Sequence, residues 1–163
     1  MMAKKPMRRL DDQGGFTLLE GMFAALVLAI GLLALAGMQG ISLTKNVDAN
    51  ELTLVTNLAA DMMERIQFNR RNAAVYNNID TLAAGTQPAT DVMGRGDYAQ
   101  WQQRLNATNL PGIQGRVVVV NPFGPATLNQ SQVTIQVNWN AHTRTGAFVL
   151  GRNVTLVAVV APE

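Results

Sequence analysis

A long stretch without any charge near the N-terminus constrains this chain more than any other feature. From Gly21 to Thr44 there are 24 residues, and none of them is Asp, Glu, Lys or Arg. As a helix rising about 1.5 Å per residue, this stretch is roughly 36 Å long, enough to cross a hydrocarbon core of about 30 Å. Basic residues hold the flanking end of such a helix in the cytoplasm. Four of them precede the stretch: Lys4, Lys5, Arg8 and Arg9.

Glu20 lies at the start of this apolar stretch and not in the basic segment before it. A lone carboxylate in lipid costs on the order of 2.5–3.5 kcal/mol on insertion scales. No basic partner is near it in the sequence, so we predict a functional role for Glu20. The alternative is an acid that snorkels to the lipid headgroups from the end of the helix.

The segment from Gly14 to Glu20 reads Gly-Gly-Phe-Thr-Leu-Leu-Glu. Behind a short basic leader and ahead of an apolar helix, it resembles the class III signal of type IV pilins and pseudopilins. The resemblance implies that a prepilin peptidase removes residues 1–15 by cutting after Gly15. It also implies that the same enzyme N-methylates the new terminal residue, Phe16, and that Glu20 is needed for assembly, where it would set the register between subunits.

Three further segments resemble minor pilins of the PilV kind, the type IV pilus modification proteins: residues 58–70, 101–115 and 133–139. This resemblance implies a minor subunit that helps to initiate pilus assembly in a priming or tip complex and affects fibre function in adhesion and motility. Its partners would be other minor and major pilins, bound through the N-terminal helix. The chain would lie in the bacterial inner membrane, with its leader cytoplasmic and its globular domain periplasmic, and then in the pilus fibre or its tip. Minor pseudopilins of type II secretion have similar N-termini and are the nearest alternative.

Two other interpretations of the N-terminus remain open. A conventional secretory signal would be cut after Ala36, and a plain signal anchor would not be cut. Either would leave a secreted or membrane-anchored domain that binds a ligand. Acidic residues at positions 11, 12 and 20 and an apolar run that continues to Leu43 disfavour the secretory signal.

Composition argues against several other functions. Removing residues 1–15 takes away four basic and two acidic residues, which leaves nine of each sign, so the mature chain is formally neutral and no nucleic-acid partner is expected. The chain has no cysteine, and its single histidine, His142, excludes sites built from several histidines. No nucleophile motif or phosphate-binding loop is present. We therefore expect no enzyme activity, no catalytic residue, no bound metal and no cofactor.

No proline interrupts residues 16–70, which predicts a single long helix over this range. Its first part, residues 16–44, would be the transmembrane and assembly half, and residues 45–163 would form the globular domain. Apolar residues with helical spacing in the second half predict a buried stripe: Leu52, Val55, Leu58, Met62 and Ile66. We expect Met63 and Phe68 in the same core, Asp61 paired with Arg65, and the arginines at the helix end in solvent.

The remaining chain predicts a loop over 69–90, a short helix over 97–107 that Asp97 caps, and then strands. The strands are expected at 116–120, 133–139, 148–150 and 154–160, with Gly151 as a bulge. The predicted fold class is α+β of the type IV pilin kind. One long N-terminal helix, its apolar half protruding, packs on a small antiparallel sheet.

Overall fold

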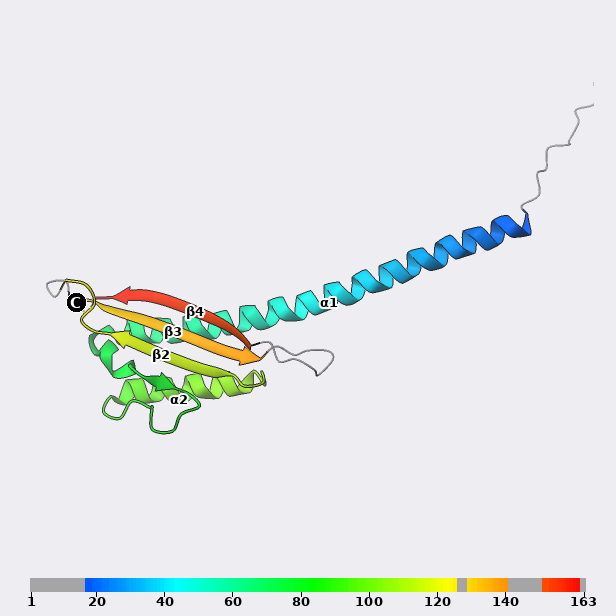
Figure 1. The fold of residues 1–163 in the computed structure, drawn as a ribbon. Helices are drawn as coiled ribbons and strands as arrows, with labels where there is room; N and C mark the ends of the chain where they lie inside the picture. The colour runs from blue at the N-terminus through cyan, green and yellow to red at the C-terminus, as the bar shows by residue number, and fades with distance from the viewer. Residues whose placement is uncertain (1–16, 126–128, 141–150, 162–163) are drawn as a thin grey trace, which may run out of the picture. The chain divides into compact units, whose positions relative to one another are not determined.

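The computed structural model describes residues 17–125, 129–140 and 151–161. The chain divides into two units, Met1–Lys45 and Asn46–Glu163. Its first element, helix α1, covers Leu18–Phe68 and contributes to both (Figure 1). The predicted long helix is therefore confirmed, and it begins and ends within two residues of the expected bounds.

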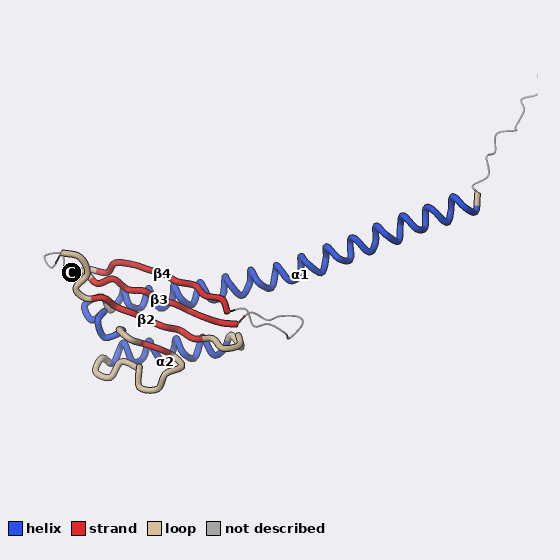
Figure 2. The backbone as a smooth tube through the Cα atoms, in the orientation of Figure 1, coloured by secondary structure: helices blue, strands red, loops and turns tan. Residues whose placement is uncertain are grey.

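The second unit is an α+β domain, as predicted. After α1 come a 3-10 helix η1 (Arg70–Tyr76) and a short strand β1 (Ile79–Asp80). Helix α2 (Val92–Ala107) and three longer strands follow: β2 (Gln114–Val120), β3 (Ser131–Asn140) and β4 (Gly151–Val160). The four strands form one antiparallel sheet in the order β1-β2-β3-β4, and the second half of α1 lies alongside β3 and β4 (Figure 2).

The core lies between the two helices and one face of the sheet. Alternate residues of β2 and β3 point inward, and Val117, Val133, Ile135 and Val137 are fully buried, as the two-residue period of the sequence predicts. Helix α1 contributes one stripe to the same core: Val55, Leu58, Ala59, Met62, Met63 and Ile66. The indole nitrogen of Trp139 on β3 also donates a hydrogen bond to the buried Glu51 of α1, at 3.2 Å.

Two residues expected in this core lie outside it. Leu52 begins the predicted stripe but is 49% exposed, and Phe68 is 83% exposed. The helical period alone set the width of the predicted stripe, whereas the sheet and α2 cover only the side of α1 that faces them. The prediction was wrong for these two residues and is confirmed for the other five.

Helix α2 starts earlier than predicted, because Asp91 and not Asp97 is its N-cap. The Asp91 carboxylate accepts a hydrogen bond from the Gly94 amide at 2.8 Å. Gly94 and Gly96, which precede the predicted start, are both helical. The buried face of the helix includes Tyr98, Trp101 and Leu105.

Two smaller corrections concern the connections. The segment expected to be a loop contains η1 and β1, and Thr81 continues the pairing of β1 by donating its amide to the Gly115 carbonyl at 2.9 Å. Gly151 is no bulge, since it pairs in unbroken register with Asn140. The strand predicted at 148–150 lies outside the described residues.

Candidate functional site

The candidate site begins at the first turn of α1. The Thr17 hydroxyl accepts a hydrogen bond from the Glu20 amide at 3.3 Å, and the Gly21 amide bonds the Thr17 carbonyl at 3.2 Å. Thr17 is thus the N-cap, and Thr-Leu-Leu-Glu has the spacing of a capping box. The Glu20 carboxylate sits where the positive end of the helix dipole favours an anion.

Glu20 is exposed in this structure, as are the apolar side chains that follow it. The large apolar residues between Leu18 and Leu43 are 56–83% exposed and occur on every side of the helix. An α-helix that is apolar all round needs lipid or other helices around it. Among the described residues, only α1 is long and apolar enough to cross a membrane. Glu20 is therefore the acid at the start of a helical surface that must be covered by lipid or by other subunits.

Two of the predicted site residues, Gly15 and Phe16, lie outside the described residues, as does His142. The roles predicted for these two residues in cleavage and N-methylation therefore stay predictions.

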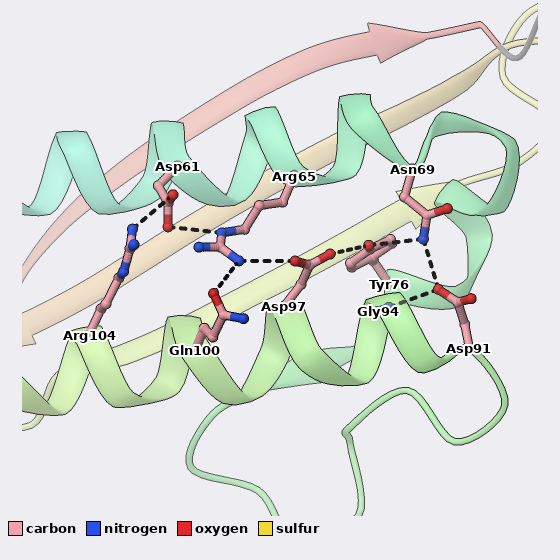
Figure 3. Close-up of polar contacts among 9 residues, drawn as sticks. All are labelled: Asp61, Arg65, Asn69, Tyr76, Asp91, Gly94, Asp97, Gln100 and Arg104. Atoms are coloured by element: carbon pink, nitrogen blue, oxygen red, sulfur yellow. Dashed lines mark hydrogen bonds and ion pairs between the residues drawn. The ribbon is translucent and has the colours of Figure 1, made fainter.

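A second polar cluster, which we call the Arg65 network, joins the end of α1 to α2 (Figure 3). The Arg65 guanidinium contacts Asp61 at 3.1 Å and Asp97 at 3.0 Å, and it donates to Gln100 at 3.0 Å. Asp61 also pairs with Arg104 of α2 at 3.0 Å. The predicted pair of Asp61 and Arg65 is confirmed. The expectation of a solvated Arg65 was wrong, because its side chain is only 17% exposed.

The network continues from Asp97 into the buried phenol of Tyr76, whose hydroxyl donates to the carboxylate at 2.6 Å (Figure 3). The side-chain amide nitrogen of Asn69 donates to the Tyr76 hydroxyl oxygen at 3.1 Å and to the Asp91 carboxylate at 2.8 Å. Burial raises the pKa of Tyr76, and the hydrogen bond to Asp97 raises it further. Burial lowers the pKa of Arg65, but its hydrogen bonds to Asp97 and Asp61 outweigh this effect, so that its pKa is raised.

This network has the chemistry of a structural clamp. Its carboxylates hold hydrogen bonds or ion pairs within the cluster, and no buried side-chain nitrogen or oxygen in the described parts of the chain lacks a partner. No group of three or more His, Asp or Glu side chains among the described residues could hold a metal. The network therefore fixes α2 against α1.

Sequence reasoning found Glu20 and the local pair of Asp61 and Arg65, but it missed the rest of the Arg65 network. Its links join residues up to 43 positions apart, as for Asp61 and Arg104, which no local period reveals. For the missed part, the usable signal in the sequence was Asp91. Asp is a common N-cap residue, and Asp91 lies three positions before Gly94, whose backbone amide it binds.

A helix that is apolar on all sides and continues into an α+β domain is compatible with membrane anchoring before assembly. Residues 10–36 match the family described as the prokaryotic N-terminal methylation motif. The matched residues include Gly15, Phe16 and Glu20. No curated protein and no solved structure gives a significant match to the chain. The motif is the N-terminal signal of type IV pilins and pseudopilins, and a long N-terminal helix packed on a small antiparallel sheet is a type IV pilin-like arrangement.

Proposed function

We propose that this chain is a minor pilin of a type IV pilus, of the PilV kind, which helps to initiate assembly in a priming or tip complex. The resemblance of residues 58–70, 101–115 and 133–139 supports the finer assignment to the PilV kind, and one observation carries the assignment to pilins. The methylation motif over residues 10–36 runs directly into a helix whose apolar side chains are exposed on all sides.

In this proposal a prepilin peptidase cuts after Gly15 and methylates Phe16. Residues 1–15 are the leader, residues 16–44 the assembly half of the helix, and residues 45–163 the globular domain. Before assembly the helix spans the bacterial inner membrane, with the globular domain in the periplasm. It then packs among the helices of other minor and major pilins in the fibre or its tip.

Glu20 sets the axial register of the subunit. After cleavage, the α-amine of Phe16 is cationic even when it is N-methylated, and the Glu20 carboxylate of an adjacent subunit can reach it. Away from water the attraction between the two charges is strong, whereas an unpaired charge carries a desolvation penalty of several kcal/mol. A pair that forms only at the correct stagger therefore selects that stagger. The capping position of Glu20 supports this role, because the bond between the Thr17 hydroxyl and the Glu20 amide fixes the turn that carries the carboxylate.

Mass spectrometry of the mature N-terminus tests the processing. The expected terminus is a methylated Phe16. A terminus at Gly37 would identify a secretory signal cut after Ala36, and an intact Met1 would identify an uncut anchor. Either result refutes the pilin assignment and favours a secreted or anchored binding domain.

Glu20→Gln tests the register, since it removes the charge and keeps the size. We expect the variant to be made, cleaved and retained in the membrane, yet largely missing from sheared fibres on immunoblots normalised to membrane levels. Glu64→Gln, an exposed acid of the same helix in the second unit, is the matched control and should enter fibres normally. Normal incorporation of Glu20→Gln would show that its charge does not set register.

A further inference from the structure

The two edges of the sheet are built differently. The edge at β1 is closed by side chains. The Gly115 amide of β2 donates to the Thr81 hydroxyl at 2.9 Å, and the Val119 amide donates to the Asn77 side chain at 2.9 Å. An ion pair of Asp80 and Arg116, at 3.0 Å, adds charge to this edge. Short strands, charges and satisfied amides are the usual means by which proteins prevent an edge from pairing with another strand.

Within the described residues, the opposite edge, at β4, has neither a short strand nor amides satisfied by side chains. Strand β4 runs for ten residues in unbroken register with β3, without a proline, lysine or bulge. Its one charged residue, Arg152, is paired with Asp48 of α1 at 3.0 Å. No strand in the described ranges pairs with its outer side. Over residues 153–160 the edge carries no charge, and a long edge of this kind is a template for another strand.

The pairing register of the sheet determines which backbone amides and carbonyls of β4 point away from β3. Gly115 turns its amide and carbonyl away from β3, toward Thr81. In antiparallel sheets this orientation alternates along each strand, and Gly115 pairs with Val137, which in turn pairs with Val154. The backbone amide and carbonyl of Val154 therefore point toward β3. Those of the odd-numbered residues between 153 and 159 point away from it and form the free edge.

The side chains of β4 indicate which strand would fit beside it. Val157 and Val159 are 56% and 50% exposed on the outer face, in line with the exposed Val118 and Val120 of β2. On the inner face, three partly buried residues of β4 pack against the core: Val154, Leu156 and Ala158. A strand added beside residues 154–160 therefore meets apolar side chains on both faces and no charge.

We propose that the free edge of β4 binds an extended strand from another subunit of the assembly, uncharged and apolar on both faces where it lies against residues 154–160. The backbone hydrogen bonds supply the attachment, and the valines select the sequence. This inference rests on the proposed pilin function and deepens it by naming a contact surface of the globular domain.

Symmetry argues against an antiparallel second copy of β4 as the incoming strand, and this favours a strand from a different kind of subunit. An antiparallel pair of two β4 strands relates the two copies by a two-fold axis perpendicular to the sheet, which reverses one copy end for end. The second half of α1 runs alongside β4 (Figure 2), so the axis would also reverse this part of the helix. Subunits anchored in one membrane through the start of α1 must keep the same direction.

Val157→Pro tests the proposal in the full-length chain, expressed in its host with the other pilins. Proline removes an amide that points away from β3, a position at which an edge strand tolerates it. Val157→Thr is the matched control, because it keeps the amide and changes only the side chain. Relative to wild type, we expect the amount of the Val157→Pro variant in sheared fibres to fall about tenfold, which corresponds to the loss of one hydrogen bond. The amount of the Val157→Thr variant should change far less. Unchanged incorporation of Val157→Pro would overturn the proposal.

Two further readouts separate the causes. If wild type is processed but never reaches fibres, the proposed function itself fails, and this inference fails with it. Amide hydrogen exchange of the wild-type chain needs no variant. The amides of Asn153, Thr155, Val157 and Val159 should gain protection in fibres relative to the chain alone in detergent, and equal exchange would refute strand addition even if Val157→Pro unfolds. A dimer of the purified chain that Val157→Pro abolishes would assign the edge to self-association and overturn the choice of partner.

Discussion

Gly115→Ala should destabilise the globular domain, because β2 passes directly against Trp101 at this position. A Cβ on residue 115 would lie 2.6 Å from Trp101 Cζ3, closer still to Cη2, and 2.8 Å from Leu105 Cδ1. Ordinary contacts between such atoms are about 3.5–4.0 Å long. Something must therefore move by about 1 Å or more.

The surroundings leave Trp101 little room to move. Its side chain is fully buried, and its indole nitrogen donates to the Leu58 carbonyl of α1 at 2.8 Å. Moving the ring either breaks that bond or pushes α2 away from the sheet. Overpacking of a filled core typically costs about 1–3 kcal/mol, and the immobile ring puts this substitution near the upper limit. At roughly 4 °C per kcal/mol for a domain of this size, the melting temperature should fall by about 10–12 °C.

Thermal unfolding of a soluble domain that begins at Asn46, followed by circular dichroism, measures this change. Gly96→Ala is the matched control, because nothing lies within 4 Å of its added Cβ and alanine favours the helix by about 0.5–1 kcal/mol. In a Trp101→Phe background, which lacks the outer ring atoms, Gly115→Ala should cost less. A melting temperature of Gly115→Ala within about 2 °C of wild type would refute the assigned contact.

Two other substitutions test the core and the Arg65 network. Met62→Asp should prevent the domain from folding, since the fully buried Met62 would be replaced by an unpaired charge, whereas Leu52→Asp, at a half-exposed site of the same helix, should leave a folded domain by circular dichroism. Tyr76→Phe should lower the free energy of unfolding by about 1–2 kcal/mol at neutral pH, because it removes the hydroxyl between Asn69 and Asp97. Because folding raises the pKa of Tyr76 above the value of about 10 in the unfolded chain, its contribution is complete below pH 10 and is lost as the pH rises further. Denaturant titrations from pH 7 to 11 should show this loss in wild type and not in Tyr76→Phe, and parallel curves would contradict it.

Local chemistry was enough to predict α1, β3 and the candidate N-terminal site. The absence of proline and the helical spacing of apolar residues predicted α1 to within two residues at each end, because each depends only on near neighbours. Alternation over residues 133–139 predicted β3 and its buried face. The segment around Glu20 is contiguous, so its resemblance to pilin signals did not depend on the fold.

Only the tertiary structure decided between residues that local sequence makes equally suitable as helix caps, core residues or edge-closing residues. Asp91 and Asp97 are both of a residue type that caps helices, yet Asp91 is the N-cap of α2, whereas Asp97 lies inside the helix and binds Arg65 and Tyr76. Leu52 and Met62 belong to one predicted stripe, yet only Met62 meets the sheet and α2. The two sheet edges likewise differ because Thr81 and Asn77, far from β2 in the sequence, return to close one of them. Such choices depend on which distant segments meet, and the sequence specifies those meetings only through the whole fold.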